Sequence, residues 1–157
     1  MDIGIIIYSR TGHTLSVARK LEKRLAADGH DVTLEELKAV EPLDLSATTA
    51  DLKSIPAIDT YDALVLGSPV NGGRMSAPMK RYLDEIPSLQ GKKAVLLLTH
   101  FLPKAWGANQ TFEQMTEVCE AKGATVCGTG DVWWTSLRRG RQISRAVDDL
   151  AHCLESQ

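Results

Sequence analysis

Short runs of apolar residues alternate along this chain with segments in which apolar residues recur every three or four positions. A strand that is covered on both faces needs apolar side chains at nearly every position, so the runs predict buried β-strands. The pattern predicts five of them, at residues 3–8, 31–36, 63–66, 94–99 and 125–132.

The segments between the runs predict amphipathic helices, because spacings of three and four residues place side chains on one helix face. The four apolar stripes are Val17, Ala18, Leu21 and Leu25; Met79, Tyr82, Leu83 and Ile86; Phe112, Met115, Val118 and Cys119; and Ile143, Val147, Leu150 and Leu154. Strands that alternate with helices are typical of an α/β fold with a doubly wound parallel sheet and helices on both faces. In such a sheet a ligand lies outside the carboxyl ends of the strands, where we expect three loops to converge, at residues 9–14, 68–76 and 99–109.

Composition limits the function classes. The 157 residues, of which 43% are hydrophobic, fit a single domain over residues 1–157. A net charge of −2 does not favour nucleic acid, and the apolar runs are too short to span a membrane, so we expect a cytoplasmic protein. Three cysteines without C-x-x-C spacing predict buried thiols rather than disulfides or a metal site. Residues 37–60 lack periodicity and predict a surface connection with one short helical turn.

The first loop ends an apolar run, contains several hydroxyl groups and leads into a helix. Its residues are Ser9, Arg10, Thr11, Gly12, His13 and Thr14. A helix start presents unpaired backbone N–H groups and the positive end of the helix dipole, which favour a phosphate. The loop matches neither the triphosphate nor the dinucleotide motif, so we expect a single phosphomonoester, such as that of flavin mononucleotide (FMN). The alternative is an ordinary turn in which Thr11 or Thr14 only caps the helix.

These six residues resemble the phosphate loop of the flavodoxin family, with His13 where flavodoxins usually have asparagine. The resemblance implies a flavodoxin-like sheet with strand order 2-1-3-4-5 and one FMN per chain. Because histidine titrates near pH 6.5, a protonated His13 would make phosphate binding pH dependent.

The second loop, within residues 67–79, resembles the flavin loop of NAD(P)H:quinone reductases of the tryptophan-repressor-binding type. The resemblance implies that backbone groups near Asn71 and Gly72 face the flavin N5 atom and that Arg74 and Met75 line the ring. The expected flavin contacts are Pro69, Val70, Asn71, Gly72, Gly73, Arg74 and Met75. The alternative is a glycine-rich turn before a helix.

The third loop follows a buried strand and carries aromatic side chains, which can stack on a planar flavin ring. The candidate contacts are Thr99, His100, Phe101, Leu102, Trp106 and Gly107. Phe101 and Trp106 are equal candidates for the stacking ring, and either can instead pack on the protein.

Trp133 and Trp134 precede three arginines, Arg138, Arg139 and Arg141. Because this segment follows the last strand, we predict that it lies away from the ligand crevice, as a helix entry with the tryptophan rings packed beneath. If the segment has a function, an acidic redox partner is favoured over DNA.

The residues and the resemblances together imply an FMN-binding, flavodoxin-like electron-transfer protein, monomeric or dimeric, that serves redox partner proteins. No catalytic side chain, metal, nucleic-acid partner or membrane partner is expected. The rival is an NAD(P)H-dependent FMN quinone reductase that transfers two electrons to a small-molecule acceptor. A third possibility is a flavin-free interaction domain with the same fold.

Overall fold

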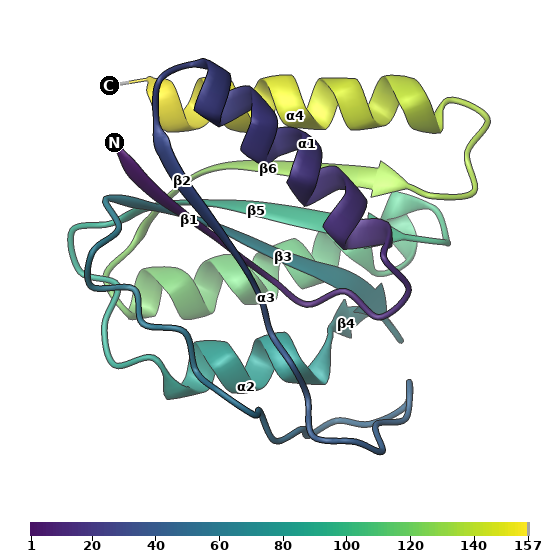
Figure 1. The fold of residues 1–157 in the computed structure, drawn as a ribbon. Coiled ribbons are helices and arrows are strands. Elements are labelled where there is room, and N and C mark those ends of the chain that lie inside the picture. The colour runs from purple at the N-terminus through teal and green to yellow at the C-terminus, as the bar shows by residue number, and fades with distance from the viewer. Residues whose placement is uncertain (157) are drawn as a thin grey trace.

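The structure, a computed structural model, describes residues 1–156 and has a parallel sheet at its centre. The strand order is β2-β1-β3-β5-β6, which confirms the predicted doubly wound order (Figure 1). The five parallel strands are β1 (Asp2–Ile7), β2 (Asp31–Glu36), β3 (Ala63–Asn71), β5 (Lys93–His100) and β6 (Thr125–Trp133). All five carboxyl ends therefore lie at one edge of the sheet.

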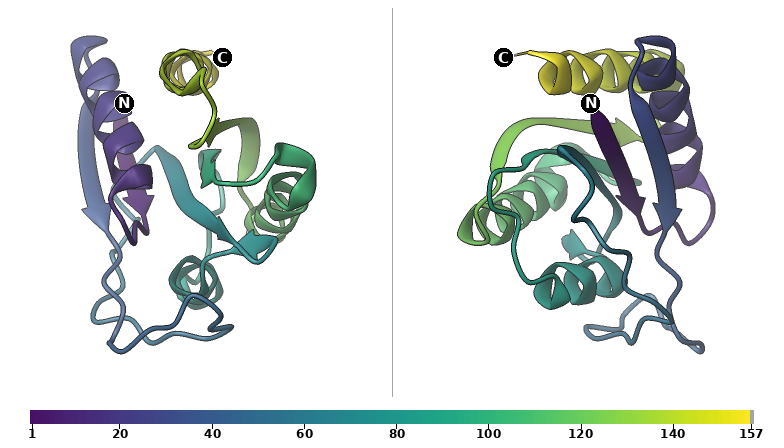
Figure 2. Two further views of the ribbon diagram at one scale, coloured as in Figure 1. Left: turned by 90° about the vertical axis from the view of Figure 1, so that its right-hand side faces the viewer. Right: turned by 60° about the vertical axis from the view of Figure 1, so that its left-hand side comes forward.

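Helices cover both faces of the sheet (Figures 1 and 2). One face carries α1 (His13–Ala27) and α4 (Arg139–Glu155), and the other carries α2 (Ala77–Glu85) and α3 (Ala108–Ala121). Strand β1 is buried on both faces after its exposed first residue, Asp2. Ile5 packs in the core beneath α1 and α4, whereas Ile6 packs in the core beneath α2 and α3, so apolar residues are needed on both sides.

Two local predictions need correction. Residues 37–60 contain no helical turn; their only paired element is a β-bridge between Ala39 and Leu52. Of the cysteines, only Cys119 is buried, while Cys127 and Cys153 are partly exposed. Within residues 1–156, none of the helices combines the length and the apolar composition needed to cross a bilayer.

The second loop is a β-hairpin rather than an irregular turn. Strand β3 continues to Asn71 and pairs antiparallel with β4 (Arg74–Met75), which adds a sixth strand to the sheet. The hairpin turn consists of Gly72 and Gly73, whose φ angles are 58° and 77°. A two-residue hairpin turn with positive φ at both positions has the twist of the flanking strands, and glycine adopts it without strain.

The hairpin turn lies directly against the third loop. After the short helix η1 (Lys104–Trp106), Gly107 has a φ angle of 136°, and a Cβ atom there would lie 2.7 Å from the Cα atom of Gly73. Only a residue without a side chain allows this approach, so the two loops are held together backbone to backbone.

Substituting Gly107→Ala should therefore lower the free energy of unfolding by about 1–3 kcal/mol, because either the loops separate or the backbone is strained. Urea denaturation measures the change. The matched control is Gly140→Ala, since a Cβ atom at Gly140 meets nothing within 4 Å. Equal stability of the Gly107→Ala variant and the wild type would contradict the close approach.

Candidate functional site

The first and third loops are joined at the carboxyl edge of the sheet. Thr14, in the first turn of α1, and Thr99, near the end of β5, are both buried, and their hydroxyl oxygens lie 2.8 Å apart. The Tyr8 amide donates to the Gly67 carbonyl at 3.0 Å, which ties the start of the first loop to β3. Together with the contact of Gly73 and Gly107, these bonds bring all three predicted loops to one place.

Backbone N–H groups of the first loop lack acceptors among the described residues of the protein. Among residues 1–156, the amides of residues 10–14 donate no hydrogen bond to the protein, and the next amide, of Leu15, donates to Ser9 Oγ at 3.1 Å. Gly12 precedes the first residue of α1 with a φ angle of 90° and no side-chain cap. The helix start therefore presents a set of unpaired donors, which is the arrangement that binds anions.

The side chains of this loop have different surroundings. Ser9 Oγ accepts a hydrogen bond, so its proton remains available, and the Thr14–Thr99 pair likewise keeps one hydroxyl proton beyond its mutual bond. Thr11 is exposed. The Arg10 guanidinium donates to the Leu43 carbonyl at 3.2 Å and so extends towards the connection of residues 37–60.

A hollow of about 420 Å³ lies between the hairpin turn and the third loop. It is lined by Val70, Gly72, Gly73, His100, Phe101, Leu102, Pro103, Trp106 and Ala108. Phe101 and Trp106 are 52% and 67% exposed, so both aromatic rings are available to a ligand in the hollow. The hollow has apolar walls and an opening, which suits a flat aromatic molecule.

A buried pair of serines fixes the hairpin. Ser68 Oγ accepts from the Ser76 amide at 2.9 Å and lies 2.8 Å from the Pro69 carbonyl oxygen. Ser76 also caps α2, because its Oγ accepts from the Met79 amide. The contact between Ser68 and Ser76 therefore joins the two ends of the hairpin.

Two of the predicted flavin contacts lie elsewhere. Met75 is buried in the core beneath α2 and α3, and Arg74 lines a separate hollow beside Asp84 and Glu117. Arg74 and Met75 line that hollow together with residues of α2 and α3, whereas the glycine turn of the hairpin lines the hollow beside the third loop.

Trp134 was predicted to lie away from the crevice, and that prediction is wrong. The His13 ring stacks on the Trp134 ring, with centroids 4.1 Å apart and planes at 14°, and meets Phe101 edge-on at 5.4 Å. The Arg139 guanidinium lies over the Trp134 ring, 4.7 Å from the ring centroid. The signal was present in the sequence, because β6 is parallel to its neighbours and its carboxyl end must reach the same edge.

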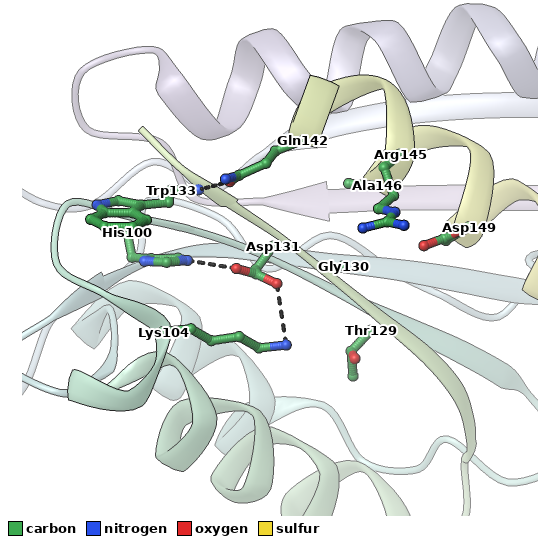
Figure 3. A pocket seen from close by; sticks show the side chains of 10 residues that line it. All are labelled: His100, Lys104, Thr129, Gly130, Asp131, Trp133, Gln142, Arg145, Ala146 and Asp149. Carbon is green, nitrogen blue, oxygen red and sulfur yellow. Dashed lines mark hydrogen bonds and ion pairs between the residues drawn. The ribbon is translucent and has the colours of Figure 1, made fainter. Parts of the chain in front are cut away.

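Strand β6 also fixes the third loop. The buried His100 ring lies between two acceptors. Its Nε2 atom is 2.7 Å from Asp131 Oδ2 (Figure 3), and its Nδ1 atom is 2.5 Å from the Leu102 carbonyl oxygen. The Phe101 carbonyl accepts from Trp133 Nε1 at 2.9 Å and from Thr135 Oγ1 at 3.0 Å. The Phe101 carbonyl is therefore held by the last strand and the turn that follows it, and the Leu102 carbonyl is held by His100 of β5, whose ring contacts Asp131 of β6.

Asp131 is charged at neutral pH. Burial raises the pKa of this carboxyl, but the hydrogen bond from His100 and the nearby Lys104 ammonium together lower it by more. The pKa of Asp131 therefore lies below its usual range. Lys104 Nζ is 3.4 Å from Asp131 Oδ1, and both line a second hollow of about 590 Å³ along β6. His100 lines both hollows.

The stacked His13 should make stability depend on pH. Burial, and then the charge of Arg139, lower the pKa of His13, so the folded state binds fewer protons than the unfolded state. This contribution is complete above about pH 6.5 and is lost as the pH falls below it. The difference in melting temperature between the wild type and His13→Asn should therefore shrink as the pH is lowered, as followed by circular dichroism.

The matched control is His152→Asn, at an exposed position of α4. A difference between the wild type and His13→Asn that stays constant with pH would show that the stacked ring does not carry the dependence.

Comparison with known proteins agrees with this architecture. The model of the family described as NADPH-dependent FMN reductase matches residues 1–137. An NAD(P)H dehydrogenase (quinone) from Brucella anthropi is 25% identical over 99 residues, which are 59% of this chain and 50% of that protein. A flavodoxin from Megasphaera elsdenii is 28% identical over 133 residues, which are 83% and 85% of the two chains.

Among solved structures, the flavoprotein of Lactobacillus acidophilus NCFM in complex with FMN has a TM-score of 0.63 at 18% identity, covering 92% of this chain and 97% of that one. The chain spans about half the length of the quinone dehydrogenase that it matches. These findings confirm the flavodoxin-like fold and the resemblance to quinone reductases, and the family description names FMN, the cofactor expected from the first loop. The chain belongs to the NADPH-dependent FMN reductase family.

Proposed function

We propose that this protein binds one FMN at the carboxyl edge of its sheet and transfers single electrons between redox partners. The observation that carries the proposal is the position of the unpaired amides of residues 10–14, which lie at the same edge as the apolar hollow between the second and third loops. A phosphate donor set and a site for a flat ring are the two parts that FMN requires.

The residues present fit this cofactor. The amides of residues 10–14 and the hydroxyls of Ser9 and Thr11 would hold the phosphate. The hairpin turn of Gly72 and Gly73 and the aromatic residues of the third loop would frame the ring. When bound, FMN supplies the electron-accepting chemistry, and the protein's contribution is to orient the ring, exclude water from part of it and leave an edge accessible.

The exposure of the third loop supports a carrier. Phe101, Leu102 and Trp106 are all more than half exposed beside the hollow, so a ring edge there would be accessible to a protein partner. The M. elsdenii flavodoxin is matched over 85% of its length, which supports the same assignment.

The second candidate is an NAD(P)H-dependent quinone reductase. The family description and the B. anthropi relative favour it. The hollow along β6 adds room beside the ring site for a second small molecule, because His100 lines both.

FMN should bind at least about 100-fold more tightly than riboflavin, because riboflavin lacks the phosphate and would leave the loop amides without their charge-assisted hydrogen bonds. Quenching of flavin fluorescence during titration of the protein gives both dissociation constants. Equal affinities would contradict the role of the first loop, and the absence of quenching by either flavin would contradict the flavin site as a whole.

Anaerobic spectroscopy separates the two candidates. For a one-electron carrier, dithionite titration of the FMN-loaded protein should pass through a stage with a long-wavelength absorption band, and NADPH should reduce the protein slowly. For a reductase, stopped-flow mixing with NADPH should bleach the flavin rapidly with no such band, which would overturn the carrier assignment.

A further inference from the structure

Four of the loops at the edge of the sheet that carries the candidate site contain no acidic residue, whereas the connection after β2 contains several, including Glu41 beside Arg10. Residues 9–14, 68–76, 99–109 and 133–141 contain no aspartate or glutamate, although the chain has twenty. The same loops carry six of the eighteen lysines and arginines: Arg10, Arg74, Lys104, Arg138, Arg139 and Arg141. The charge of these four loops is therefore opposite in sign to the net charge of −2.

These six cations have different neighbours. Among the ion pairs of residues 1–156, one includes Lys104, which pairs with Asp131, and none includes the five arginines. Arg10 donates to the Leu43 carbonyl and Arg139 to the Trp134 carbonyl, so neither is offset by a carboxylate. Three of the five arginines lie within residues 138–141, where the turn after β6 meets the start of α4.

Exposed apolar side chains lie in the same region. Leu137 in that turn is completely exposed, and Phe101 and Leu102 of the third loop are more than half exposed. The two segments adjoin, because the Phe101 carbonyl accepts hydrogen bonds from Trp133 Nε1 and Thr135 Oγ1. We call the surface formed by Phe101, Leu102, Leu137, Arg138, Arg139 and Arg141 the arginine face.

The arginine face borders the phosphate loop. Arg139 lies over Trp134, which stacks on His13, the first residue of α1. A phosphomonoester carries a charge of about −1.5 to −2 at pH 7, so one bound FMN leaves the three arginines with net positive charge. Exposed arginines around apolar side chains are the composition of protein interfaces rather than of ordinary surface.

We propose that the arginine face docks an electron-transfer protein with an acidic surface, so that its redox centre lies beside the bound flavin. This inference rests on the proposed function and names the class of partner. The arginines provide charge complementarity, which accelerates encounter, and the apolar side chains provide the desolvated centre of the contact. If the net charge of −2 decided which partner binds, the protein would instead favour a partner with a basic surface.

An acidic plant-type [2Fe–2S] ferredoxin is a suitable probe. In the test reaction, one electron leaves the reduced iron–sulfur cluster, which is oxidised, and is taken up at the bound flavin, which is reduced; a proton from water balances the charge. Stopped-flow absorbance follows the reaction of reduced ferredoxin with the FMN-loaded protein at increasing salt. The rate should fall as salt rises from about 20 to 300 mM, because screening weakens attraction between opposite charges.

The double variant Arg138→Glu/Arg141→Glu should slow the reaction at low salt by at least about tenfold. Glutamate at the start of α4 is compatible with the helix dipole, so the variant should fold, and its flavin spectrum checks this. The matched control is Lys20→Glu/Lys23→Glu, which makes the same charge change at exposed positions of α1. These positions lie in the middle of the helix, away from its first residue, His13, at the site.

Three results would overturn the proposal. The first is a wild-type rate of electron transfer that rises with salt, and the second is equal slowing by the two double variants. The third is a loss of NADPH-dependent bleaching in the arginine variant as large as its loss of electron transfer from ferredoxin. That third result would assign the arginines to binding of the nucleotide. The salt dependence of the wild type alone decides the matter if the arginine variant does not fold. A wild-type protein that binds no FMN would contradict the proposed function and not the choice of partner.

Discussion

The side chains of the central strands are buried on both faces of the sheet, with Ile5 towards α1 and α4 and Ile6 towards α2 and α3. This burial leaves no space on either face for a ligand, because the helices needed to cover the strands occupy it. Only the strand ends remain, and parallel connections bring every carboxyl end to the same edge. The position of the candidate site is therefore a consequence of how the core is made, and the loops at this edge are free to supply binding groups.

Contacts between residues distant in sequence hold these loops in place. Thr14 bonds Thr99, and the glycines at 73 and 107 touch through their backbones. From the far side, β6 holds the third loop through Asp131, Trp133 and the turn after them. Because the loop carbonyls are already engaged by the protein, the hollow is largely preformed, and a ligand that enters it need not order the loops itself.

The binding groups and the charged groups of this edge are separate. The first loop presents backbone amides, while its one arginine extends to Leu43, and Arg138, Arg139 and Arg141 lie after β6. A phosphate can be held by amides and the helix dipole without using these arginines. The local surface charge therefore remains positive in a chain whose net charge is −2, and it is this local field, rather than the net charge, that a partner protein meets first.

The apolar pattern by itself determined the element types, and a short motif identified the loop that begins α1, because both depend on local sequence. The strand order was implied by the resemblance of that motif to the flavodoxin family. The tertiary structure decided what depends on pairing and packing. Strand β3 continues into a hairpin because Val70 and Asn71 find partners in β4, and Met75 is thereby turned into the core. Trp134 meets His13, 121 positions earlier, only because β6 is parallel to β1 and ends at the same edge. Such contacts join residues that no local window contains, so sequence periodicity cannot report them.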